Sequence, residues 1–92
     1  MIVLNVFYRT RPGMREQFVE EVTARGLLAA IREETGCGGY EYFAALEDPD
    51  RLFLLEQWAD EAALAAHQAS ANMAALRAVK DRYVLTTDIR RY

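Results

Sequence analysis

Residues 2–10, with the sequence IVLNVFYRT, constrain the fold most, because this segment is apolar on both sides. It is rich in β-branched and aromatic residues and too short for a lone helix, so it predicts a strand. Alternate side chains of a strand point to opposite faces, which places Leu4 and Val6 on one face and Val3 and Phe7 on the other. A strand of this kind needs cover on both sides.

The segment that follows predicts a helix. After Arg11-Pro12-Gly13, apolar residues recur at helical spacing from Met14 to about Thr35. Gly26 interrupts this pattern at a cost of about 1 kcal/mol relative to alanine, which we attribute to close packing or a slight kink. Gly36 is a suitable left-handed stop for the helix.

The rest of the chain contains two more strand patterns, a broken helix and a final strand. Residues 38–46 and 52–58 predict a hairpin, because the segment between them has turn chemistry. Asp60 is a natural N-cap for a helix that runs to about Gln68. Ser70 caps a second helical segment, from Ala71 to about Lys80, and Tyr83 to Tyr92 predict the last strand.

The order β-α-β-β-α-β predicts an α+β, ferredoxin-like domain with an antiparallel sheet. We expect residues 1–92 to form a single domain. The helices cover one face of the sheet, and the simplest cover for the other apolar face is the same sheet of a second chain. The sequence therefore predicts a homodimer in which two sheets pack face to face.

Composition excludes several partners. The net charge is −3 with acidic and basic residues interspersed, which does not favour nucleic acid or an anionic membrane. No apolar run approaches the roughly 20 residues of a membrane helix, and the first residues lack a signal-peptide pattern. The single cysteine, Cys37, excludes an internal disulfide and a cysteine metal cluster. We expect a soluble, cytoplasmic protein.

The stretch from Leu52 to Ser70 holds the rarest side chains, Trp58 and His67. Histidine has an unperturbed pKa of about 6.5, which suits proton transfer near neutral pH. The competing interpretation is a histidine at the helix–sheet margin, bonded to backbone or water. A buried Trp58 anchors helix to sheet and seeks a partner for its N–H, and it can also form a wall against a flat aromatic substrate.

Other side chains share the predicted space between helices and sheet. Tyr40 and Tyr42 are two residues apart and so lie on one face, where packing is the favoured role and cavity lining the alternative. Glu56 lies on the same strand face as Trp58, and a buried carboxylate there needs a partner, for which Arg77 is a candidate.

Four motifs span most of the chain: Arg9 to Gly13, the E-x-G-C-x-G-Y motif of residues 34–40, the LEQW of residues 55–58, and the A-L-x-A-H-x-x-S of residues 63–70. With these motifs in this order, the chain resembles the antibiotic biosynthesis monooxygenase domain family. It is most similar to the quinol monooxygenases within that family. The resemblance implies a dimeric α/β barrel.

The resemblance also implies an activity: oxidation of a small phenolic, quinol or polyketide-like aromatic by O₂, with no metal or flavin cofactor. His67 would be the pocket base or a hydrogen-bonding group, and Trp58, Tyr40, Tyr42, Phe18 and Asn72 would contact the substrate. Relatives often carry a second histidine where this chain has Asn72. An asparagine can hold a substrate oxygen but cannot act as a base near neutral pH.

Two other functions remain open. The same fold can isomerise or merely bind a small ligand, and the absence of a second histidine favours this alternative. A purely structural dimeric domain is the other. A helix–sheet space filled by Phe18, Val22, Trp58 and Leu76 would support the structural role, whereas a cavity beside His67 would count against it.

Overall fold

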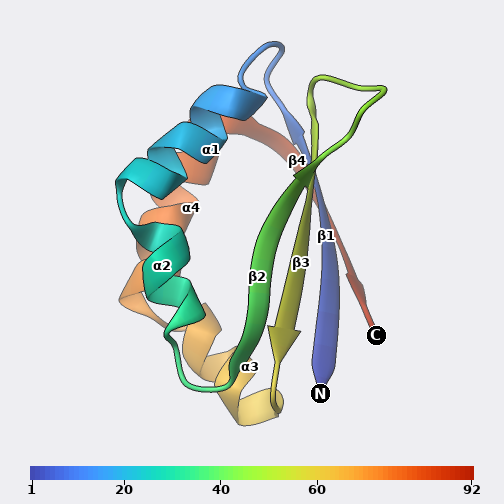
Figure 1. The fold of residues 1–92 in the computed structure, drawn as a ribbon. Helices are drawn as coiled ribbons and strands as arrows, with labels where there is room; N and C mark the ends of the chain where they lie inside the picture. The colour runs from blue at the N-terminus through green and yellow to red at the C-terminus, as the bar shows by residue number, and fades with distance from the viewer.

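The computed structural model describes residues 1–92 and confirms the predicted β-α-β-β-α-β order, with each helical region divided into two helices (Figure 1). The elements are β1 (Ile2–Thr10), α1 (Arg15–Ala24), α2 (Leu27–Arg32), β2 (Cys37–Ala44), β3 (Arg51–Trp58), α3 (Glu61–Gln68), α4 (Ala71–Tyr83) and β4 (Val84–Arg91). This is the ferredoxin-like α+β fold that the sequence predicts.

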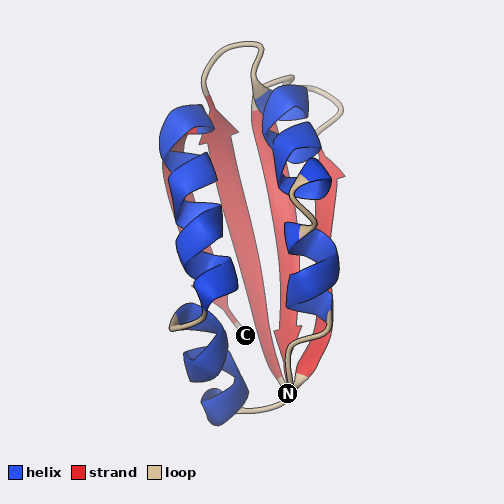
Figure 2. Ribbon diagram, turned by 90° about the vertical axis from the view of Figure 1, so that its left-hand side faces the viewer, coloured by secondary structure: helices blue, strands red, loops and turns tan.

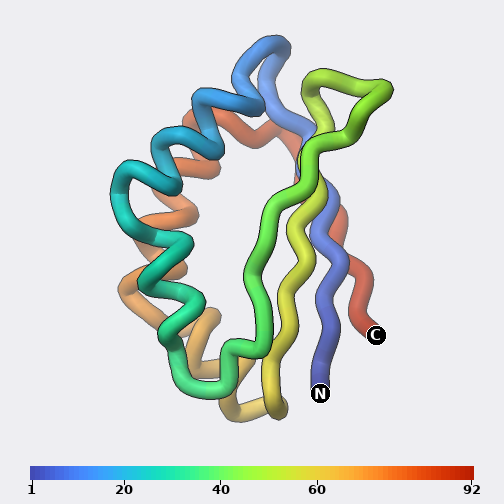
Figure 3. Tube along the Cα trace, viewed as in Figure 1, coloured from blue at the N-terminus to red at the C-terminus, as the bar shows by residue number.

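The sheet has four strands in the order β2-β3-β1-β4, and every neighbouring pair is antiparallel. The two-sided apolar strand β1 therefore lies inside the sheet, where Val6 pairs with Leu54 on one side and with Ile89 on the other. The chain ends meet at one end of the sheet, where the backbone groups of Val3 and Tyr92 exchange hydrogen bonds of 3.1 and 2.8 Å (Figure 3).

All the helices lie on one face of the sheet, as two columns in which α1 and α2 stand beside α3 and α4 (Figure 2). The core fills the space between the helices and this covered face. Alternate residues of β1 and β3 point into it, so Val6, Leu54 and Trp58 are buried. From the helix side, Phe18, Val22, Leu76 and others complete a single cluster.

The opposite face, which we call the open face, is covered by no element of the chain (Figure 1). Its centre is aromatic, with the rings of Phe7 and Phe53 5.1 Å apart and those of Phe43 and Phe53 5.9 Å apart. Phe43 is 44% exposed, and Phe7, Phe53 and Leu55 are half-buried. The expectation that both faces are apolar is confirmed, and this chain covers only one of them.

The predicted single helix from Met14 to about Thr35 is wrong in one respect, because it is two helices. Gly26 separates them with a left-handed backbone, φ 72°. A Cβ atom at Gly26 would meet nothing within 4 Å, so close packing does not explain the residue. The positive φ does explain it, since an L-residue adopts that conformation only at a cost.

The two predicted caps on the other helical column are confirmed. Asp60 Oδ1 accepts a hydrogen bond of 2.8 Å from the backbone N–H of Ala63, and Ser70 Oγ accepts one of 3.0 Å from that of Met73. Helix α4 continues to Tyr83, beyond the predicted end near Lys80. None of the helices has the length and apolar character that crossing a membrane requires.

Candidate functional site

His67 lies near the C-terminal end of α3 with its side chain directed at the sheet. It is only 3% exposed. Its ring stacks on the indole of Trp58, with centroids 4.4 Å apart and planes inclined by 24°. The ring of Tyr40 meets it edge-on at 5.9 Å. The only histidine of the chain is thus enclosed by aromatic walls from β2 and β3.

Glu34, in the loop between α2 and β2, holds one side of this imidazole. Its Oε1 lies 2.9 Å from His67 Nδ1, and its Oε2 accepts a hydrogen bond of 3.1 Å from the side-chain amide of Asn72. One carboxylate therefore joins α3 to α4 at the break between them. The sequence interpretation missed this role, although Glu34 is the first residue of the E-x-G-C-x-G-Y motif.

Glu56 faces the other ring nitrogen. His67 Nε2 lies 3.9 Å from Glu56 Oε1, and the same oxygen accepts a hydrogen bond of 3.1 Å from the indole N–H of Trp58. Burial raises the pKa of the Glu56 carboxyl, while the hydrogen bond from Trp58 and the proximity of His67 oppose that rise. The suggested pairing with Arg77 is wrong, because Arg77 donates to the backbone oxygen of Gln68 at 3.2 Å.

We call these three residues the Glu34–His67–Glu56 cluster. Gly36 allows the loop that carries Glu34 to approach His67. Its φ is 80°, and a Cβ atom at this position would lie 2.5 Å from the Cβ of Ala63. The backbone oxygen of Gly36 also accepts a hydrogen bond of 2.8 Å from the N–H of Ala59. The loop is thereby pressed against the start of α3. No group of three or more His, Cys, Asp or Glu side chains is arranged to hold a metal ion.

The remaining predicted site residues lie in a row with the histidine. Phe18 contacts Tyr42 with centroids 5.9 Å apart, and Tyr42 contacts Tyr40 at 6.2 Å. Burial raises the pKa of both tyrosines. The hydroxyl of Tyr42 is buried without a hydrogen-bond partner. The structure thus brings together Phe18, Tyr42, Tyr40, His67 and Trp58, whereas the side-chain amide of Asn72 hydrogen-bonds to Glu34.

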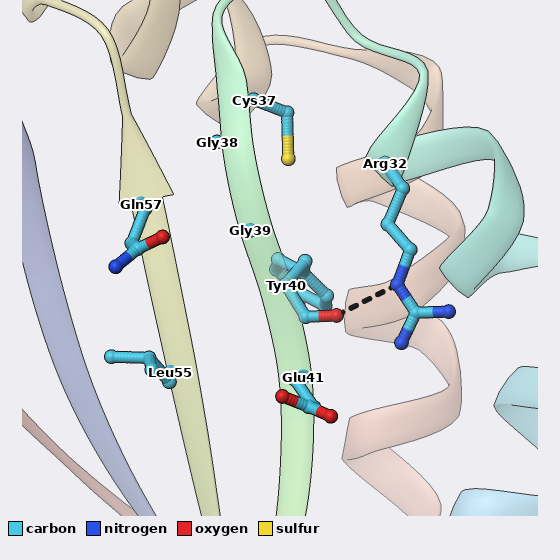
Figure 4. A pocket seen from close by; sticks show the side chains of 8 residues that line it. All are labelled: Arg32, Cys37, Gly38, Gly39, Tyr40, Glu41, Leu55 and Gln57. Atoms are coloured by element: carbon cyan, nitrogen blue, oxygen red, sulfur yellow. Dashed lines mark hydrogen bonds between the residues drawn. The ribbon is translucent and has the colours of Figure 1, made fainter.

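None of the four main surface pockets is lined by His67. The largest of the four, of about 540 Å³, lies at the β2 edge, where Gly38 and Gly39 have no side chains to cover the strand (Figure 4). Beside it, Arg32 Nε donates a hydrogen bond of 2.9 Å to the backbone oxygen of Tyr40. Another, of about 510 Å³, lies between α1 and β2 and is lined in part by Tyr42. The side chains of Phe18, Val22, Trp58 and Leu76 fill the helix–sheet space.

The fold and the cluster together define a small ferredoxin-like α+β domain with one carboxylate-held histidine beneath its helices. The chain belongs to the antibiotic biosynthesis monooxygenase family, whose family model matches residues 1–79. The resemblance seen in the sequence motifs is therefore confirmed. The class of activity that this membership indicates is that of a monooxygenase, an oxidoreductase.

Individual proteins are similar to this chain in sequence or in fold. The chain is 35% identical over 72 residues to the Bacillus subtilis (strain 168) protein named "Putative monooxygenase YcnE", a match that covers 78% of this chain and 74% of that protein. The crystal structure of PA3566 from Pseudomonas aeruginosa is similar with a TM-score of 0.86 and 26% identity, over 99% of this chain and 90% of that one. A structure from Nitrosomonas europaea, described as a putative antibiotic biosynthesis monooxygenase, shares the fold with a TM-score of 0.87 at 22% identity, over 100% of this chain and 96% of that one.

Proposed function

We propose that the protein is a cofactor-independent monooxygenase that oxidises a phenolic, quinol or polyketide-like aromatic with O₂, and that His67 is its base. The observation that carries this proposal is the 2.9 Å contact between His67 Nδ1 and Glu34. An ionised carboxylate can only accept a hydrogen bond, so it leaves the proton on Nδ1 and the lone pair on Nε2. Nε2 is then free to take a proton from an acidic substrate.

The reaction balances without an external reductant. A base removes a proton from the substrate, and the electron-rich anion passes an electron to O₂ and combines with it as a peroxide. Loss of water from the peroxide converts a CH₂ or aromatic C–H into a carbonyl, so one oxygen atom enters the product and the other leaves as water. All four electrons come from the substrate, and the protein supplies the base and a dry enclosure.

The aromatic residues around the base suit a flat substrate, because Trp58 and Tyr40 present a ring face and a ring edge. The pocket between α1 and β2 reaches Tyr42, whose ring contacts Tyr40. Binding next to His67 from this side requires Tyr42 and Tyr40 to swing away, since His67 is 3% exposed. The unpaired hydroxyl of Tyr42 would gain a hydrogen-bond partner from such a substrate.

The test is oxygen consumption by metal-free protein with a panel of quinols and anthrones. We expect turnover that the variant His67→Ala reduces by about 100-fold or more, the contribution expected of a general base. Gln68→Ala, an exposed neighbour on the same helix, is the matched control and should keep full activity. No oxygen uptake above background, or an active His67→Ala variant, would refute the proposal.

We propose further that a second copy of the chain covers the open face. The support is the aromatic cluster of Phe7, Phe43 and Phe53, which no element of this chain covers. A small domain also gains the burial that its own core lacks by self-association. Light scattering at micromolar concentration should give the mass of a dimer, and a monomer would contradict this.

A binding or isomerising protein without oxygenase activity is the second candidate. One observation favours it: the amide of Asn72 is engaged by Glu34 and supplies no second base. The filled helix–sheet space favours the purely structural role instead. Thermal stabilisation by an aromatic ligand with neither oxygen uptake nor product would support it. If no ligand of the panel stabilises the protein, the result supports a purely structural dimeric domain.

A further inference from the structure

We propose that Glu34 is a positioning residue that determines which nitrogen of His67 acts as the base, and that Asn72 holds Glu34 in place for this task. This inference rests on the proposed function of His67. It assigns a role to a residue outside the predicted site and a new role to Asn72, which the sequence interpretation placed against the substrate.

The geometry selects one tautomer of the imidazole. With the proton on Nδ1, His67 donates to Glu34 Oε1 at 2.9 Å. With the proton on Nε2, two acceptors would face each other at that distance, and the Nε2 proton would point toward Glu56 Oε1 at 3.9 Å, which is beyond hydrogen-bond range. The neutral ring therefore keeps its proton on Nδ1.

Asn72 fixes the carboxylate from the other side. Its side-chain amide donates to Glu34 Oε2 at 3.1 Å, so each oxygen of Glu34 accepts a hydrogen bond from a different helix. The Glu34 side chain is mostly shielded, with 16% of its surface exposed, so water competes little for these contacts. Asn72 is thus part of the support of the base.

The consequence for the reaction is directional. The Nε2 lone pair is on the side of the ring that faces Glu56, and a proton taken from the substrate arrives on Nε2. The imidazolium then lies between the carboxyl groups of Glu34 and Glu56, at 2.9 and 3.9 Å.

The single histidine makes the tautomer directly measurable, because ¹⁵N NMR of the ring shows one pair of nitrogens. At a pH about 2 units above the ordinary histidine value of about 6.5, we expect the wild type to carry its proton on Nδ1. Glu34→Met removes the acceptor at similar length and should redistribute the proton between the two nitrogens. Glu34→Gln keeps one accepting oxygen, and the Asn72 amide can turn so that its oxygen accepts from the new NH₂ group, so this variant should restore the wild-type tautomer.

Glu33→Met is the matched control, because Glu33 is an exposed neighbour in the same loop. It should leave the ring signals unchanged. An unchanged tautomer in folded Glu34→Met would overturn the inference, whatever the activity. Should that variant fail to fold, Asn72→Leu tests the same support, and a wild-type tautomer in it would contradict the role of Asn72.

Turnover separates this inference from the proposed function. We expect kcat to fall about tenfold or more in Glu34→Met with little change in KM, and to recover partly in Glu34→Gln. If Glu34→Met changes the tautomer of His67 but leaves kcat unchanged, Glu34 has no role in the reaction. If the wild type itself consumes no oxygen, the proposed function fails, while the ring signals still decide whether Glu34 positions His67.

Discussion

The two faces of the sheet differ in burial, although the central strands carry apolar side chains on both of them. Leu54 and Leu55 are consecutive residues of β3 with identical side chains. Leu54 points to the helices and is 0% exposed, whereas Leu55 points to the open face and is half-buried. Val6 and Phe7 of β1 are divided in the same way. Apolar character is therefore shared by both faces, and burial is not.

The chemical groups follow the same division. The Glu34–His67–Glu56 cluster and the aromatic row lie on the covered face, where low exposure strengthens hydrogen bonds and raises the pKa values of Glu56, Tyr40 and Tyr42. The open face carries an aromatic cluster over which Arg90 lies, 5.3 Å from the ring of Phe7. The covered face is thus the place for chemistry, and the open face has the character of an association surface.

The largest effect is expected when Leu54 on the covered face and Leu55 on the open face are replaced one at a time. Leu54→Ala should lower the free energy of unfolding by about 2–5 kcal/mol, because it leaves a cavity in a closed core. Leu55→Ala should cost about 1 kcal/mol or less in the monomer, since little of its surface loses packing. Urea denaturation of both variants at low protein concentration measures the two values. Equal costs would contradict the distinction between the faces.

The second test places a charge on the open face. Phe53→Glu should weaken the proposed dimer on the order of 100-fold, or about 2.7 kcal/mol, because it brings carboxylates into the apolar centre of the interface. Leu46→Glu is the control, since Leu46 is fully exposed in the loop between β2 and β3. Sedimentation equilibrium measures both dissociation constants. A dimer unaffected by Phe53→Glu would show that the sheets do not pack through this cluster.

The third test concerns how the helix layer is held against the covered face. Gly36 and Gly26 both have positive φ, of 80° and 72°, but only at Gly36 would a Cβ atom meet a neighbour, Ala63 Cβ at 2.5 Å. Both alanine variants carry the backbone cost, and Gly36→Ala should lose about 1–3 kcal/mol more by overpacking. Thermal unfolding compares the two. Equal losses of stability in the two variants would mean that α3 moves to accommodate the new Cβ atom at no cost.

The smallest expected effect is the pH dependence due to Glu56. Burial raises the pKa of this carboxyl in the folded protein above its ordinary value of 4.5. The folded state therefore binds the proton more tightly, and its stability falls as pH rises from about 4.5 through the folded pKa. Glu56→Gln does not titrate and keeps an acceptor for Trp58, so wild type should lose stability relative to it over this range. Glu41→Gln, an exposed change on β2, should show no such trend.

Predictions based on neighbouring residues succeeded. Asp60 and Ser70 cap their helices, and Gly36 takes a left-handed conformation, because each effect depends on a few consecutive residues. The failures involve residues far apart in the sequence. Arg77 does not pair with Glu56, and Glu34 was overlooked although it lies 2.9 Å from His67, because 33 positions separate the two in the chain.

The sequence by itself determined the order of the elements, the two-sided apolar strand β1 and the shared face of Trp58 and Glu56, since strand periodicity and local turn chemistry suffice for these. Only the tertiary structure decided that the Gly36 loop carries Glu34 onto His67, and that the space beside the ring is filled. Such contacts depend on how distant segments pack in three dimensions. The covered face is the place where this packing brings the distant segments together.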